Sequence, residues 1–169
     1  MYLIKLSMLT VFILMDLALN SMCDHDEMFE DMTKRNTVGV LMFGAQIIVQ
    51  ILVFVVFFLL LCGTFLFRVG ILGQLLKNIK AQLAVSVLYF ILTGVNGIYR
   101  VIFMFKEQSM SDLWDVEGFT VVAALQRFVA TVYYYTALRT GLKLGNPMFY
   151  QRDVWVKMYQ QDPAKLLGK

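Results

Sequence analysis

The chemically distinctive residues of this chain are polar side chains that stand inside long apolar segments. Several recur four positions apart, a spacing that places both members of a pair on one face of a helix. The set comprises Asp16 with Asn20, Gln46 with Gln50, Asn96 with Arg100, and the adjacent Gln126 and Arg127. A carboxyl and two guanidinium groups could carry protons or bind a charged substrate. The same groups could instead form a hydrogen-bonded layer that fixes the register of packed helices.

The charges of this polar layer need partners, because an unpaired charge inside hydrocarbon is costly. We therefore expect Asp16 to neutralise Arg100, Arg127 or both. A transporter typically contains interrupted helices in two matching halves of the chain. The one such interruption here is Gly-Val-Asn-Gly at 94–97, and it has no counterpart elsewhere. The pattern favours a structural layer over a transport pathway.

The sequence contains no motif typical of an enzyme. A nucleophile elbow, a phosphate-binding glycine loop and a zinc-protease helix motif are all missing, and the single histidine lies in an acidic loop. That loop, Cys23–Asn36, could be read as a metal site. A calcium loop starting at Asp24 would have Phe29 at its glycine position and Arg35 at its glutamate position, so it does not fit. We predict no enzyme activity, metal or cofactor.

The segment Val38–Phe67 contains no Asp, Glu, Lys or Arg, and it is apolar on every side. It exceeds the roughly 20 residues that a helix needs to cross the hydrocarbon core of a bilayer. Further apolar runs predict helices at about 2–22, 81–105 and 118–138. The predicted fold is an all-α, polytopic membrane protein: a four-transmembrane-helix bundle over 1–145 and a tail over 146–169 with a short interfacial helix.

Composition agrees with a membrane protein, since 59% of the residues are hydrophobic and only 16% are charged. The net charge of +3 gives no indication of a nucleic-acid partner. A cleaved signal peptide is the alternative for the first run, with Leu6–Met15 as its apolar part. Asn20 stands where a cleavage site needs a small residue, so a retained helix is favoured. The segment Arg68–Lys80 and the tail are basic, which predicts cytosolic termini.

The tail begins with a helix stop and continues with aromatic residues. Gly145, Asn146 and Pro147 should end the fourth helix. Trp155 shares one helical face with Val154, Met158 and Tyr159, as in an interfacial helix. We expect the tail to pack against Arg68–Lys80 and to form a recognition surface. The tail motif comprises Leu144, Gly145, Asn146, Pro147, Phe149, Tyr150, Gln151 and Trp155.

The segment Arg139–Trp155 reads RTGLKLGNPMFYQRDVW, and it resembles the signature tail of the transmembrane protein 138 family. The resemblance extends to Gln126-Arg127-Phe128 with the tyrosines that follow, and to Gly63–Phe67 at the end of the second helix. Asn146 stands where Asp is usual in the family, and the Cys23–Asn36 loop is extended, so a role for that loop is not carried over.

The resemblance implies a small four-pass ciliary protein without enzyme activity. It implies a requirement for cilium assembly, through ciliary membrane organisation or vesicle trafficking to the cilium. The implied locations are the ciliary membrane, the ciliary base, and vesicle or vacuole membranes, with the lipid bilayer and proteins at those places as partners. The alternative is a small transporter or channel, or an accessory subunit of a larger membrane complex, that uses the polar layer.

Overall fold

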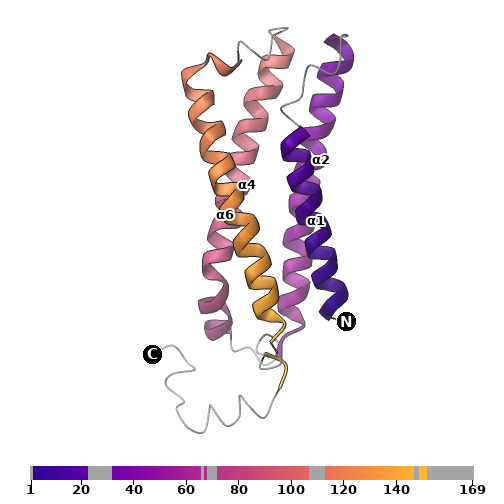
Figure 1. Cartoon of the computed structure of the whole chain (residues 1–169), viewed down its shortest axis with the longest axis vertical. Helices are drawn as coiled ribbons and strands as arrows, with labels where there is room; N and C mark the ends of the chain where they lie inside the picture. Colours follow the sequence, from indigo (N-terminus) through magenta and orange to yellow (C-terminus); the bar gives the residue numbers. More distant parts are fainter. Residues whose placement is uncertain are drawn as a thin grey trace.

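The computed structural model describes residues 2–22, 32–65, 67, 72–106, 113–146 and 149–151. These residues form four long helices and no strand. The helices are α1 Tyr2–Met22, α2 Met32–Cys62, α4 Leu72–Phe105 and α6 Glu117–Leu144. Figure 1 shows them side by side in an elongated bundle, which confirms the predicted fold class. The start of α1 and the end of α6 lie at the same end of this bundle.

Three of the helices extend beyond their predicted bounds. The second begins at Met32 instead of about 38, the third at Leu72 instead of about 81, and the fourth ends at Leu144 instead of about 138. Hydropathy marks only the apolar part of a helix. Lys, Arg, Gln and Leu in the flanking segments are good helix formers, so the helices continue past the apolar runs.

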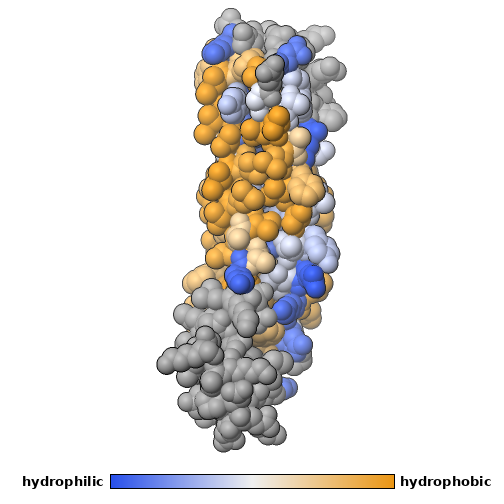
Figure 2. Space-filling model, turned by 90° about the vertical axis from the view of Figure 1, so that its left-hand side faces the viewer, coloured by the Kyte–Doolittle hydropathy of each residue, from blue (hydrophilic) through white to orange (hydrophobic). Residues whose placement is uncertain are grey.

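Within the described part of the chain, three segments are long and apolar enough to cross a membrane: Tyr2–Met22, Asn36–Cys62 and Ile79–Phe105. The fourth helix, α6, runs beside α4 (Figure 1) but is less apolar, because it contains Gln126, Arg127 and three consecutive tyrosines. Figure 2 shows an apolar band on one face of the bundle, with hydrophilic residues toward both ends. The protein is an integral membrane protein.

The core of the bundle lies where the faces of all four helices meet. Helix α1 packs most extensively on α2, and α4 on α6. Alanines at 130 and 137 are buried on α6 and let neighbouring backbones approach closely. A second, smaller cluster of Leu113, Phe119 and Ala123 lies near the start of α6. The main buried cluster includes Leu9, Ile13, Val53, Val56, Leu60, Tyr89, Val129, Ala130, Tyr133, Ala137 and Leu144.

Candidate functional site

A buried carboxyl group joins the four helices. Asp16 of α1 has 0% of its surface exposed. Its Oδ2 accepts hydrogen bonds from the hydroxyls of Tyr89 on α4, at 2.9 Å, and Tyr134 on α6, at 2.8 Å. Its Oδ1 accepts a third from Nε2 of Gln50 on α2, at 3.3 Å. We call Asp16, Gln50, Tyr89, Thr93 and Tyr134 the polar centre, to which every helix of the bundle contributes.

The donors of the polar centre hold one another in place. Nε2 of Gln50 also donates to the Thr93 hydroxyl at 3.2 Å, which ties α2 to α4. The hydroxyl oxygens of Tyr89 and Tyr134 are 3.0 Å apart. Each hydroxyl has a single proton to donate. Both hydroxyls direct that proton to the same oxygen of Asp16, Oδ2. Hydrogen bonds to a charged group contribute about 1.5–3 kcal/mol each, so three neutral donors can offset much of the burial cost of the carboxylate.

An amide tier of Asn20, Gln46 and Gln126 lies one helical turn away. Oδ1 of Asn20 accepts from Nε2 of Gln126 at 3.0 Å and from Nε2 of Gln46 at 3.5 Å. Asn20 follows Asp16 by four residues, so the two layers lie about 6 Å apart along α1. Together they fasten α1 to the other helices.

The expected pairing of Asp16 with an arginine is wrong. The guanidinium carbon of Arg100 lies 6.0 Å from the centroid of the Phe119 ring, and that of Arg127 lies 5.5 Å from a Trp114 ring. Arg100 is seven residues beyond Thr93, or about 10 Å along α4. The hydroxyls take the place of a cation, because tyrosine donors lie at the depth of the carboxyl, whereas the long arginine stems extend along aromatic surface.

Of the other predicted polar-layer residues, Asn96 is buried. Its Oδ1 has no hydrogen-bond partner among the residues that the structure describes. Arg127 is exposed and Arg100 is half-buried. The structure thus brings together Asp16 with Gln50 and Asn20 with Gln46 and Gln126, while both arginines lie apart from Asp16.

Sequence reasoning missed the tyrosines. A run such as Tyr133–Tyr135 near the end of a membrane helix is typical of an interfacial aromatic belt, but only Tyr135, at 62% exposed, faces outward. Tyr133 is 2% exposed and stacks on Tyr89 with ring centroids 4.6 Å apart. A usable signal existed: a buried carboxylate needs donors, and Tyr89 and Thr93 share the four-residue spacing of the other polar pairs.

A tail junction lies at the end of the bundle where α1 starts and α6 ends. We define it as Tyr2, Gly141, Gly145, Phe149 and Tyr150. The Tyr2 hydroxyl donates to the Gly141 carbonyl at 2.6 Å, and its ring meets that of Tyr150 edge-on at 6.3 Å between centroids. A Cβ at Gly145 would collide with the Tyr2 ring. The start of the tail is therefore folded back onto α1.

The predicted helix stop is in place, since α6 ends at Leu144 and Gly145 is its C-cap. In the tail motif, Leu144 and Phe149 are buried, whereas Asn146, Tyr150 and Gln151 are exposed. Phe149 is held by a backbone hydrogen bond from its N–H to the Asn146 carbonyl at 3.0 Å. Pro147, Trp155 and the predicted interfacial helix lie outside the described residues, as does most of the acidic Cys23–Asn36 loop.

Both layers and the tail junction depend on α1, which bears on the signal-peptide alternative. Cleavage after residue 22 would remove Asp16 and Asn20 from the buried layers and Tyr2 from the tail junction. It would also expose the residues that pack on Leu9 and Ile13, both of which are buried. The packing therefore supports retention of α1 in the folded protein.

Comparison with known proteins places these features in a family. The family model described as Transmembrane protein 138 matches residues 39–159, which include most of α2 and the whole of α4 and α6. The chain is 29% identical to Transmembrane protein 138 of Danio rerio and 28% identical to that of Mus musculus, each over 103 residues. Those two matches span 61% of this chain and 62% of each relative.

A longer match covers most of the chain. The chain is 26% identical to Transmembrane protein 138 of Xenopus tropicalis over 156 residues, which cover 92% of this chain and 91% of the relative. No solved structure matches the chain. The family model alone covers well over half of the sequence, and the three relatives share its name. The chain belongs to the transmembrane protein 138 family.

Proposed function

We propose that this chain is a non-catalytic, multi-pass membrane protein that acts in cilium assembly, either by organising the ciliary membrane or by directing vesicles to the cilium. The observation that carries the proposal is membership of the transmembrane protein 138 family over residues 39–159. The proposed locations are the ciliary membrane, the ciliary base, and the vesicle or vacuole membranes that supply them. Its partners are the bilayer and proteins at these places.

The chemistry of the polar centre supports a structural role. The groups that are hydrogen-bonded to Asp16 are phenol hydroxyls and side-chain amides, none of which is an activated nucleophile. They come from the other three helices, so their joint effect is to fix how the helices pack. A fixed bundle of this kind is suited to presenting a surface at one side of the membrane.

The proposed orientation places both termini in the cytosol. The start of α1 and the end of α6 lie at one end of the bundle (Figure 1). Lys5, Lys80, Arg139 and Lys143 belong to the helix segments at that end. Such cation bias marks the cytosolic side of a membrane protein. In a variant lacking both native cysteines, a cysteine at Glu30 should react only from the opposite side; reaction from the cytosol would overturn the orientation.

Deletion and rescue in a ciliated cell that naturally expresses the protein would test the function. We expect cells without it to lose cilia, and a tagged copy to restore them and to concentrate at the ciliary base or on nearby vesicles. Normal ciliation in the deletion line would refute the proposal. Flux through purified protein in vesicles, abolished by substitution of Asp16, would instead support the transporter alternative.

The tail is the proposed recognition surface. The tail junction fixes where the chain leaves the membrane, and exposed Tyr150 and Gln151 face outward there. Truncation after Gly145 should abolish ciliary localisation and ciliation while the truncated chain still inserts into membranes. If localisation and ciliation both persist, the working surface lies elsewhere.

A further inference from the structure

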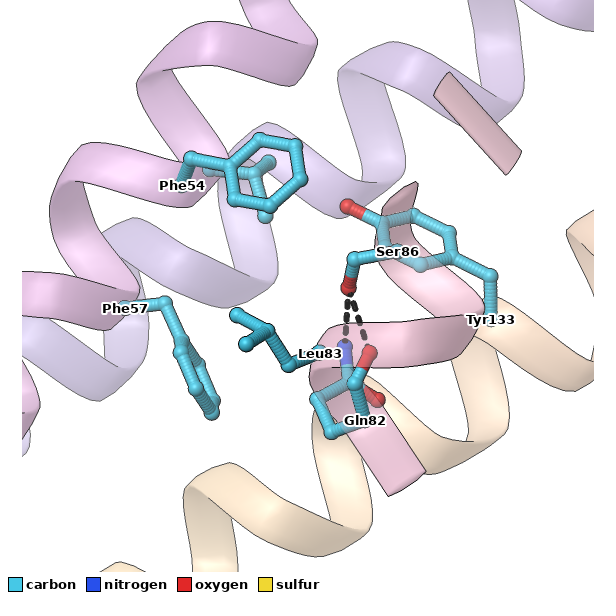
Figure 3. A pocket seen from close by; sticks show the side chains of 7 residues that line it. Phe54, Phe57, Gln82, Leu83, Ser86 and Tyr133 are labelled. Carbon is cyan, nitrogen blue, oxygen red and sulfur yellow. Dashed lines mark hydrogen bonds between the residues drawn. The ribbon is translucent and has the colours of Figure 1, made fainter. Parts of the chain in front are cut away.

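A narrow crevice lies between α2, α4 and α6, on the cytosolic side of the polar centre as oriented above. Figure 3 shows aromatic rings from α2 on one side and polar side chains of α4 on the other. Its lining includes Phe54, Phe57, Gln82, Leu83, Ser86 and Tyr133. The crevice is partly open, and it leaves about 10 Å³ for the centre of a water-sized group. That is close to the volume one water or one hydroxyl needs.

A buried side-chain oxygen of Gln82 lies beside this crevice. Gln82 is 3% exposed, and its Oε1 makes no hydrogen bond to any residue that the structure describes. The Ser86 hydroxyl donates its one proton to the backbone carbonyl of Gln82 at 2.8 Å. It can therefore only accept from the Gln82 side chain, which it does from Nε2 at 2.9 Å. Ser86 thus fixes the amide orientation and leaves the buried Oε1 without a donor among the residues that the structure describes.

The lining reaches the lipid-facing surface of the bundle. Leu83 is 43% exposed and Phe54 is half-buried. The Phe54 ring is held edge-on by Phe90, with centroids 6.3 Å apart, so it presents a fixed apolar wall. Gln82 lies three residues inside the span that starts at Ile79, or about 4.5 Å along α4. The free acceptor is therefore near the boundary between hydrocarbon and lipid polar groups.

We propose that this crevice binds a sterol-class lipid, whose hydroxyl donates to Oε1 of Gln82 while its ring system lies against Phe54 and Leu83. None of the lining side chains that the structure describes is charged, so these residues offer a phosphate headgroup no counterion. The enclosed volume admits a hydroxyl but no larger polar group. A rigid ring system also loses less conformational entropy than an acyl chain when it lies on a fixed wall.

Photo-crosslinking of the full-length protein tests the proposal. The purified chain is placed in phosphatidylcholine vesicles with a trace of a photoreactive sterol that keeps its 3β-hydroxyl, and the labelled peptides are mapped. We expect labelling at the lining segments of α2 and α4. Unlabelled cholesterol should compete about three- to tenfold better than the matching 3-ketone, which offers no proton to Gln82.

Two variants localise the interaction. Gln82→Leu should reduce labelling by a similar three- to tenfold factor, since it removes the acceptor and keeps the side chain apolar and of similar size. The matched control is Ile91→Leu, because Ile91 is an exposed residue of α4 that does not line the crevice. Its labelling should equal that of the unmodified protein. If Gln82→Leu fails to fold, the comparison of cholesterol with the ketone on the unmodified chain still tests whether the crevice recognises the hydroxyl.

Three results would overturn the proposal. Equal competition by the ketone would show that no hydroxyl is recognised. Equal labelling by a photoreactive phosphatidylcholine would show that the crevice accepts any lipid. Labelling that cholesterol does not reduce would mean that the enclosed space holds only water.

Discussion

The polar centre and the tail junction are both built on tyrosine hydroxyls, but their surroundings differ. In the polar centre, Tyr89 and Tyr134 donate to a carboxyl that is fully buried among four helices. In the tail junction, Tyr2 donates to a backbone carbonyl at the end of the bundle, beside the exposed Tyr150. In the polar centre, a lost hydrogen bond leaves buried groups unsatisfied. In the tail junction, water can replace a lost hydrogen bond.

This difference separates two roles. The polar centre determines whether the four helices pack in one arrangement, because every helix loses a partner if it is disrupted. The tail junction determines where the tail leaves the membrane, and its disruption leaves the buried layers intact. We therefore expect substitutions in the polar centre to change folding, and substitutions in the tail junction to change function at nearly constant stability.

The largest effect is expected from Asp16→Leu. It removes the buried acceptor that the Tyr89 and Tyr134 hydroxyls and the Gln50 amide share, which should lower the free energy of unfolding by about 3 kcal/mol or more. Reversible unfolding in mixed detergent micelles would measure this change. Adding Tyr89→Phe and Tyr134→Phe should restore a large part of the loss, because it removes both hydroxyls that lost their acceptor, while Gln50 keeps its hydrogen bond to Thr93.

A control combination distinguishes this arrangement from an ion pair. If Asp16 were neutralised by an arginine, Asp16→Leu with Arg127→Leu would restore stability, since it removes both charges. In the observed structure the pair of substitutions should be at least as harmful as Asp16→Leu alone. Recovery in that double variant would show that the carboxyl interacts with the guanidinium after all.

A smaller effect is expected from Tyr134→Phe alone. One of the three donors to Asp16 is lost, so the unfolding free energy should fall by about 1.5–3 kcal/mol, as for a hydrogen bond to a charged group. Tyr135→Phe is the matched control, because the neighbouring ring is 62% exposed and should tolerate the same change. Equal losses of unfolding free energy in the two variants would show that the Tyr134 hydroxyl does not stabilise the polar centre.

Much of the fold could be predicted from the sequence, because the bilayer imposes a simple requirement. Four apolar runs predict four helices, and the stop at Gly145 follows from local backbone chemistry. The polar partners were harder to predict. Asp16 and Arg100 have opposite charges at similar expected depth, so an ion pair is the natural inference from sequence. Which donors reach a carboxyl depends on helix rotation and relative height, and a four-residue spacing along one helix specifies neither.

The tyrosine run shows the same limit. Three adjacent aromatic residues near the end of a helix are typical of a membrane interface. On a helix they point in three directions, about 100° apart, so they cannot all face the same surroundings. Here Tyr133 stacks in the core, Tyr134 reaches Asp16, and Tyr135 faces outward. The packing of α6 on its neighbours determines which of these tyrosines is buried and which faces outward.

At the tail junction, Gly145→Ala tests the close approach of α1 to the tail. The added Cβ would meet the Tyr2 ring, which must move away. Because Tyr2 is at the very start of α1 and can move, the expected loss of stability is only about 1 kcal/mol. The start of the tail should become more accessible, as measured by the labelling rate of a cysteine at Gln151. Gly94→Ala is the control, since its Cβ meets no neighbouring atom within 4 Å.

The smallest change in stability is expected from Tyr2→Phe, which makes the same chemical substitution as Tyr134→Phe in the other region. Removal of this hydroxyl leaves one carbonyl, that of Gly141, without its side-chain donor at the end of the bundle. Gly141 is buried, but Tyr2 is only half-buried. Water or a lipid headgroup can therefore enter the space that the hydroxyl vacates, and the unfolding free energy should change by about 0.5 kcal/mol or less. The labelling rate of a cysteine at Gln151 should still rise, because the ring of Tyr2 is no longer fixed beside Tyr150. A loss as large as that of Tyr134→Phe would show that the tail junction is as dry as the polar centre. In that case the tail would belong to the folding core of the bundle, and its proposed independence as a recognition surface would fail.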